Sequence, residues 1–283
     1  MVSIAREQDK TVRIRNTLRS ISAISLRLRN LISSIWWTGK APPDFGEADR
    51  ILTLFTPTYG KVRAIAKGVR RTNSRLAGHL EPFTRTQLLL AHGRELDIVT
   101  QAEARERLDA LRDDVWHATA AWYLAELVDR FLEDADPHQH LYGLFVAMLR
   151  QLDEDARAHE TARSWLALRY FELHLLTDLG FRPNLHHCVN CDRPLRPEEN
   201  GYSAELGGAL CPSCRHLGQR RLSLNALKVL RLLQSSTWEA VPRLRLEGEL
   251  QGEMEAVLQS TLRYHLDREL KSWGFLQKAP TRS

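Results

Sequence analysis

The four cysteines of the chain are the residues best placed to do chemistry. They form two Cys-x-x-Cys pairs separated by nineteen residues: Cys188, Cys191, Cys211 and Cys214. This spacing is typical of zinc sites, because a Cys-x-x-Cys turn places two thiolates on one side of a tetrahedral ion. Four sulfur ligands leave no open coordination position, so we expect a structural Zn²⁺ and no catalysis at the metal.

Two disulfides or a thioredoxin-like redox pair are the alternatives for these cysteines. Disulfides are typical of exported chains, whereas the sequence has no signal-peptide pattern and its longest apolar stretch is interrupted by Arg27 and Arg29. A redox pair does not require a matching second pair. We therefore expect a cytoplasmic protein without membrane spans, in which zinc holds residues 186–216 together around a small hairpin at GYSAELGGAL.

The charge of the chain is unevenly distributed. Its formal net charge is +5, yet residues 1–75 hold fifteen Lys and Arg against five Asp and Glu. The remaining residues therefore sum to −5. A basic end predicts a polyanionic partner, most commonly nucleic acid, with an anionic membrane surface as the alternative.

Residues 61–75 carry the densest run of cations. The run contains no acid and six basic residues: Lys61, Arg63, Lys67, Arg70, Arg71 and Arg75. RILTLFT and KVRAIAKGV, joined by the turn TPTYG, read as two strands, and two further strands surround His92-Gly93. Period two then places the first three cations on one strand face.

Short strands with one cationic face predict a small oligonucleotide-binding barrel that contacts phosphates. A solvated strand face is the alternative, since Lys and Arg are common on edge strands. We interpret the neighbouring rings of Phe55, Tyr59 and Phe83 as core residues.

The rest of the chain follows a helical period. Residues 101–180 read as amphipathic helices, Ser223 is placed to cap the helix LNALKVLRLLQSS, and a last helix begins at EMEAVLQS. His265 falls on the apolar stripe of that last helix, and we interpret it as a core residue.

Enzyme motifs are absent from the sequence. There is no phosphate-binding loop, no zinc-protease helix and no Gly-x-Ser-x-Gly elbow. We therefore favour a non-enzymatic binding protein. A metal-dependent nuclease is one alternative, since the carboxylates of Asp113/Asp114 and of Asp153/Glu154/Asp155 could bind a metal ion. A zinc-stabilised interaction hub is the other alternative.

Three separated segments resemble the bacterial RecO-type recombination mediators. They are GEADRILTLFTPTYGKVRAIAKGVRR, then HCVNC with GYSAELGGALCPSC, and finally YHLDRELKSWGFL. The resemblance covers residues 46–276 and keeps the order of the segments. It implies an α+β protein, with an N-terminal OB-fold β-barrel followed by a mainly helical domain with an inserted four-cysteine zinc motif.

The resemblance also implies a function. RecO-type proteins bind single- and double-stranded DNA, anneal complementary strands and, with RecR, help to load RecA onto strands coated by single-strand-binding protein (SSB). The basic barrel of the family matches the six cations of residues 61–75, and its zinc ligands match the four cysteines. A bacterial, nucleoid-associated location follows.

The start of the chain departs from the family. A short basic strand normally precedes the Gly-Glu-x-Asp motif, but here Pro42-Pro43 stands where a central strand cannot run. We therefore expect three parts: an atypical extension over 1–45, an OB-fold over 46–102 and a helical domain over 103–283. Several interpretations of the extension stay open. One is a disordered segment, and another is a first strand of the barrel, for which TVRIRNT alternates suitably. The others are a DNA-binding arm, a transit peptide, and a misplaced start or shifted reading frame in the gene.

Overall fold

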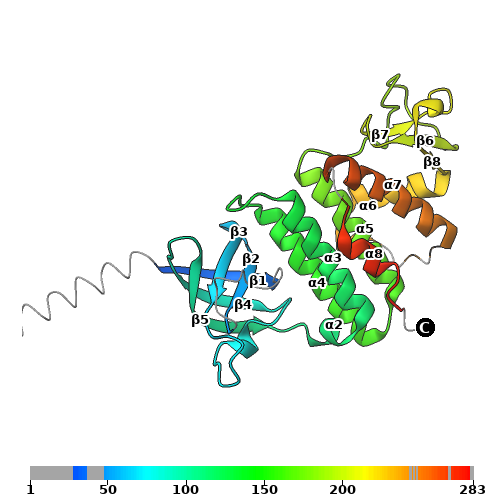
Figure 1. The fold of residues 1–283 in the computed structure, drawn as a ribbon. Helices are drawn as coiled ribbons and strands as arrows, with labels where there is room; N and C mark the ends of the chain where they lie inside the picture. The colour runs from blue at the N-terminus through cyan, green and yellow to red at the C-terminus, as the bar shows by residue number, and fades with distance from the viewer. Residues whose placement is uncertain are drawn as a thin grey trace, which may run out of the picture. The chain divides into compact units, whose positions relative to one another are not determined.

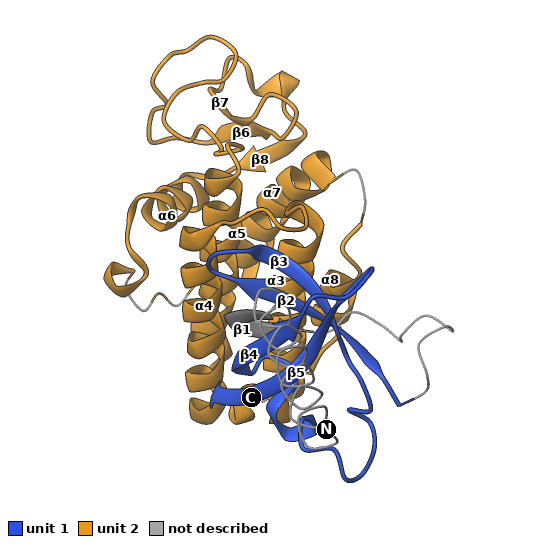
Figure 2. Cartoon of the chain, turned by 90° about the vertical axis from the view of Figure 1, so that its left-hand side faces the viewer, with its two compact units in different colours: residues 1–107 blue, residues 108–283 orange. Residues whose placement is uncertain are grey.

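The computed structural model describes two compact units, residues 1–107 and residues 108–283 (Figure 2). The residues that it describes are 28–36 (as backbone), 48–241, 244, 246, 248–266 and 269–280. Strands β1–β5 belong to the first unit, and helices α2–α8 with strands β6–β8 belong to the second (Figure 1).

The first unit is a closed five-stranded barrel. Its strands are β1 (Leu28–Trp36), β2 (Arg50–Thr56), β3 (Gly60–Ala66), β4 (Arg85–Ala91) and β5 (Asp97–Glu106). They follow one another around the barrel in the order β1-β2-β3-β5-β4, with β3 and β5 parallel and the other neighbours antiparallel. This is the closed arrangement of the OB-fold, and it confirms the predicted fold class.

Alternation along the strands supplies the barrel core. Every second residue of β2, β3 and β4 points inward, and these residues pack with two from the β3–β4 connection and one from β5. The buried cluster consists of Leu52, Leu54, Val62, Ala64, Ala66, Val69, Leu80, Leu88, Leu90 and Val99. The strands predicted at RILTLFT, KVRAIAKGV and on either side of His92-Gly93 are all present.

The barrel is closed by a strand from the N-terminal stretch. β1 pairs with β2 from Ser34 to Trp36 and with β4 from Leu28 to Ser34. β1 therefore serves as the first strand and closes the barrel. The alternative strand TVRIRNT and the Pro42-Pro43 pair both lie outside the described residues. The sequence placed the C-terminal boundary of the OB-fold at residue 102. Strand β5 continues to Glu106, so residues 103–106 belong to the barrel.

The second unit is built on packed helices. α3, α4 and α5 lie side by side, and α6, α7 and α8 pack around them (Figure 1). The helices are α2 (Asp109–Asp113), α3 (Val115–Phe131), α4 (Gln139–Ala158), α5 (Thr161–Asp178), α6 (Leu224–Ser235), α7 (Gly248–Leu266) and α8 (Lys271–Leu276). None of the helices within the described residues is long and apolar enough to cross a membrane.

Polar side chains hold the ends of these helices. Ser223 accepts a hydrogen bond from the Ala226 N–H, as its predicted capping role requires. The Glu126 carboxylate accepts bonds from the first backbone N–H groups of α8, those of Lys271 and Ser272. A carboxylate at a helix N-terminus satisfies unpaired donors and complements the helix dipole, so α8 is fastened to α3.

A small three-stranded sheet interrupts the helices. Its strands β6 (Asn200–Ser203), β7 (Gly208–Leu210) and β8 (Arg220–Leu222) lie in the order β7-β6-β8. β6 and β7 form the hairpin predicted at GYSAELGGAL. The sheet lies in the segment between α5 and α6 that contains the four cysteines.

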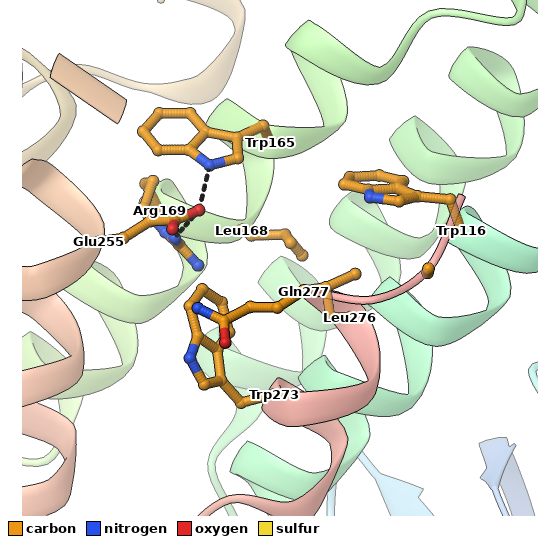
Figure 3. Close-up of a pocket in the computed structure, with 9 residues that line it drawn as sticks. Trp116, Trp165, Leu168, Arg169, Glu255, Trp273, Leu276 and Gln277 are labelled. Carbon is orange, nitrogen blue, oxygen red and sulfur yellow. Dashed lines mark hydrogen bonds and ion pairs between the residues drawn. The ribbon is translucent and has the colours of Figure 1, made fainter. Parts of the chain in front are cut away.

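A buried ion pair lies at the centre of the helical unit. Arg169 is 0% exposed, and its Nη2 lies 2.6 Å from Glu172 Oε1. Its guanidinium is 5.2 Å from the ring centres of both Trp165 and Trp273. Figure 3 shows Arg169, Trp165 and Trp273 at the wall of a pocket. The pocket has a volume of about 420 Å³, and the Trp165 indole N–H donates to the Glu255 carboxylate at 2.6 Å.

We predict that Arg169→Ala lowers the free energy of unfolding by about 3–5 kcal/mol, because it leaves Glu172 buried without a counter-charge. Urea unfolding measures this change. Arg130→Ala is the matched control, since Arg130 pairs with Glu126 at 3.9 Å on a partly exposed face, and its loss should cost about 0–1 kcal/mol. A double variant, Arg169→Met with Glu172→Gln, should be more stable than Arg169→Ala. Equal stability of the two single variants would contradict the assignment.

Candidate metal centre and nucleic-acid interface

The four cysteine sulfurs converge on one point. The Sγ atoms of Cys188, Cys191, Cys211 and Cys214 all lie within 4.8 Å of one another, and Cys191 and Cys211 are 3.7 Å apart. A disulfide would require about 2.05 Å. A tetrahedron with metal–sulfur bonds of about 2.3 Å has edges of about 3.8 Å, so four thiolates at this spacing could bind zinc.

Backbone bonds fold each Cys-x-x-Cys pair into a tight turn. In the first turn the Asp192 N–H donates to the Cys188 carbonyl at 2.9 Å, and the Cys188 N–H donates to the Arg193 carbonyl at 2.8 Å. In the second turn the Cys214 N–H donates to the Cys211 carbonyl at 2.9 Å. The two turns meet where the Asn190 amide lies 3.3 Å from Cys214 Sγ. Sequence reasoning did not identify Asn190, because its position matters only once the turns face each other.

The thiols influence each other's ionisation. Burial raises the pKa of Cys188, but hydrogen bonds from the backbone at Cys211, Cys191 and Asn190 outweigh it and bring the pKa to about 6. At Cys191 the backbone at Arg193 lowers the pKa, while burial and the three other thiols raise it to about 11. Four adjacent thiolates therefore need a cation among them.

The cysteine segment is fastened to helices α6 and α7. The buried Tyr202 hydroxyl lies 2.6 Å from Thr261 Oγ1 of α7, and Ser223 Oγ donates to Glu253 of the same helix at 2.6 Å. Arg231 of α6 donates from Nε to the Leu185 carbonyl at 2.8 Å. These bonds join both ends and the middle of the segment to the helices.

The predicted cations follow β3 and the connection to β4. Arg63 is the exposed residue of β3, and the four that follow are exposed in or beside the loop: Lys67, Arg70, Arg71 and Arg75. Five of the six predicted residues are thus exposed to solvent.

Lys61 differs from this expectation. Its side chain is only 5% exposed, and Ile65 two residues beyond Arg63 is buried as well. Period-two reasoning assumed that the outward face of β3 is open to solvent, but this strand is buried on both faces except at Arg63. The rings of Phe55 and Phe83 are buried as expected, while Tyr59 is partly exposed.

An acid from the motif before β2 holds the cationic loop. Asp49 Oδ1 accepts a hydrogen bond from the Gly68 N–H at 2.7 Å, and the Ala48 carbonyl accepts one from the Arg70 N–H at 3.0 Å. Gly68 has φ +65°, a left-handed conformation that favours glycine. Sequence reasoning quoted Gly-Glu-x-Asp only as a family motif; its Asp in fact positions the loop that carries Arg70 and Arg71.

The carboxylates considered for a nuclease have structural partners. Asp153 accepts from the Leu111 N–H at 2.9 Å, and Asp155 accepts from Ser164 Oγ at 2.6 Å. Asp114 caps α3 at the His117 N–H, while Asp113 and Glu154 are exposed. Within the described residues, the cysteines are the only group of three or more His, Cys, Asp or Glu placed to hold a metal. The geometry therefore gives no support to the nuclease reading.

Comparisons with known proteins match both units. Residues 43–107 match the family model described as Recombination protein O N terminal, and residues 112–274 match Recombination protein O C terminal. The chain belongs to the RecO family. The DNA repair protein RecO of Roseiflexus sp. is 43% identical over 235 residues, which cover 82% of this chain and 81% of that relative.

Two further relatives are similar over most of their length. The DNA repair protein RecO of Dehalococcoides mccartyi strain BAV1 is 34% identical over 82% of this chain and 89% of its own. That of Symbiobacterium thermophilum is 35% identical over 92% of this chain and 96% of its own. The RecO resemblance inferred from three sequence segments is confirmed.

We predict that removal of the metal unfolds residues 186–216 and leaves the central helices folded. Amide hydrogen exchange after treatment with a chelator should show lost protection in the cysteine segment and retained protection in α3–α5. Metal content should fall as the pH falls, because protons compete for the thiolates. Release is measured with a metal-sensitive dye, and Arg70→Gln serves as the control with unchanged metal content. Full protection of residues 186–216 after metal removal would contradict the clip.

We predict that Asp49→Ala loosens the cationic loop. The Gly68 N–H loses its acceptor, so its amide should exchange faster and affinity for DNA should fall several-fold, although the protein becomes more positive. Asp49→Asn keeps an acceptor and removes the charge, so it separates the two effects. Its affinity should equal or exceed that of the unmodified protein. If Asp49→Ala binds DNA as tightly as Asp49→Asn, the loop does not depend on this bond.

Proposed function

We propose that this protein is a non-enzymatic DNA-binding mediator that anneals complementary strands during recombinational repair. The observation that carries the proposal is the group of five exposed cations on β3 and its following loop, held by Asp49 on a closed barrel. Membership of the RecO family supports the same function.

Annealing requires two phosphate backbones to approach one another. Arginines and lysines bound to phosphates release counterions and reduce the repulsion between strands. The five cations are concentrated on one strand and one loop, so they contact backbone rather than base edges. Bases then remain free to pair, and no nucleotide hydrolysis is needed.

The partners of the proposed function are those of a recombination mediator. We propose that the protein binds single- and double-stranded DNA and acts with RecR to load RecA onto DNA coated by SSB, in the bacterial cytoplasm at the nucleoid. The barrel would contact DNA, and the helical unit with its structural Zn²⁺ would support protein contacts.

The decisive experiment measures annealing of two complementary oligonucleotides coated with SSB, without ATP. We expect faster annealing with both strands intact afterwards. We also expect the logarithm of single-strand affinity to fall with the logarithm of salt concentration, with a slope of about −3.5 if all five cations contact phosphates.

The variant Arg70→Gln/Arg71→Gln should slow annealing and reduce the salt slope by about 1.4. Arg105→Gln is the matched control, because Arg105 is an exposed barrel cation already paired with Glu103 at 2.7 Å. Cleaved strands would favour a nuclease. Annealing that is insensitive to Arg70 and Arg71 would reject the cationic face.

A further inference from the structure

A helix end fixes an exposed aromatic ring at the start of the cysteine segment. α5 terminates in a Schellman motif, in which the Phe181 N–H donates to the Leu176 carbonyl at 2.7 Å and the Gly180 N–H donates to the Thr177 carbonyl at 3.1 Å. Gly180 has φ +82°, which this motif requires. The backbone of Phe181 is therefore rigidly placed.

The ring of Phe181 stacks on the His265 ring of α7, with centroids 4.1 Å apart and planes at 21°. The Tyr264 ring meets the same imidazole edge-on at 5.3 Å. His265 was interpreted from the sequence as a core residue, but it lies half-buried in a group of three rings at the surface.

Two of these rings are largely open to solvent. Phe181 is 44% exposed and Tyr264 is 53% exposed. Large exposed apolar side chains that gather in one place commonly mark an interaction surface. A ring already stacked on one face offers its other face to a further planar group.

Two arginines are held at the backbone that follows Phe181. Arg182 follows Phe181 and donates from Nη2 to Gln234 at 3.5 Å, while Arg231 donates from Nε to the Leu185 carbonyl at 2.8 Å. Each of these bonds uses one of the five N–H donors of a guanidinium, which leaves donors for a phosphate.

The wider charge distribution agrees with an anionic ligand. Residues 181–235 hold eight Lys and Arg against four Asp and Glu, whereas residues 108–179 hold six against fourteen. The segment that carries Phe181 is thus basic, whereas α7, which carries the other two rings, holds Arg263 against Glu249, Glu253 and Glu255.

We propose that Phe181, His265 and Tyr264 form a second contact for single-stranded DNA, on which bases stack while Arg182 and Arg231 meet the phosphates. Aromatic rings accept any base, because every base has a π-face, and flanking arginines recognise the backbone. The inference rests on the proposed annealing function, since a protein that pairs two strands has to hold both.

Binding of labelled oligo-dT to the full chain, measured by fluorescence anisotropy over a series of salt concentrations, tests this contact. The variant Phe181→Leu/Tyr264→Leu should weaken binding about five- to tenfold or more at every salt concentration. Its log–log salt slope should stay unchanged, because stacking releases no counterions. By contrast, Arg70→Gln/Arg71→Gln should reduce the slope.

Two further variants control for loss of structure. Phe275→Leu removes a ring that is 70% exposed on α8 of the same unit and should leave affinity unchanged. Phe181→Trp keeps a stacking surface and should bind the oligonucleotide as the unmodified protein does, whereas Phe181→Leu should bind it more weakly. Photo-cross-linking with 5-iodouracil in the oligonucleotide should attach it to the peptides that contain Phe181 or Tyr264.

The outcomes separate this contact from the annealing function. If the double leucine variant binds within twofold of the unmodified protein while Arg70→Gln/Arg71→Gln weakens binding and annealing, the second contact is rejected and the annealing function stands. If neither variant changes DNA binding, both proposals fail. Cross-links confined to residues 61–75 would also reject the contact.

Discussion

Closure of the barrel is the constraint on which the first unit depends. The backbone donors and acceptors of an open sheet edge need partners, and β1 supplies them by pairing with β2 on one side and β4 on the other. Because β5 lies between β3 and β4 in the barrel, the chain cannot pass from β3 to β4 by a short hairpin. It has to make the connection of residues 67–84, and this obligatory connection carries four of the five exposed cations.

The core of the helical unit contains two buried charged side chains. Arg169 and Glu172 are both fully buried, so each depends on the other, and the Tyr123 hydroxyl and the Trp165 and Trp273 rings complete their surroundings. Since α8 contributes Trp273 and is held at its start by Glu126 of α3, the C-terminal helix is part of this arrangement. A short amphipathic segment at the end of the chain thereby becomes integral to the core.

Much of this structure could be predicted from local sequence. The alternation in RILTLFT, the helical periods and the two Cys-x-x-Cys pairs each depend on neighbouring residues, and the strand, the helices and the convergence of the four cysteines are all present. The exposure of Lys61 was predicted wrongly, because whether the outward face of a strand is covered depends on distant parts of the chain. The position of β1 was missed because LRNLISSIW does not alternate apolar and polar residues and lies in an Arg- and Ser-rich stretch. Asp49 and Asn190 escaped notice because their roles are hydrogen bonds to residues made adjacent only by folding.

The path of the chain around the cysteine segment has a consequence for how such proteins vary. The segment leaves α5 at Gly180 and returns at Ser223, and Leu185 near its start is bonded to Arg231. Arg231 lies eight residues along α6 from Ser223, a rise of roughly 12 Å. Entry and exit are therefore neighbours, separated by a gap that a handful of residues can span. A segment whose two ends lie this close can change in length while the helices at its base keep their positions.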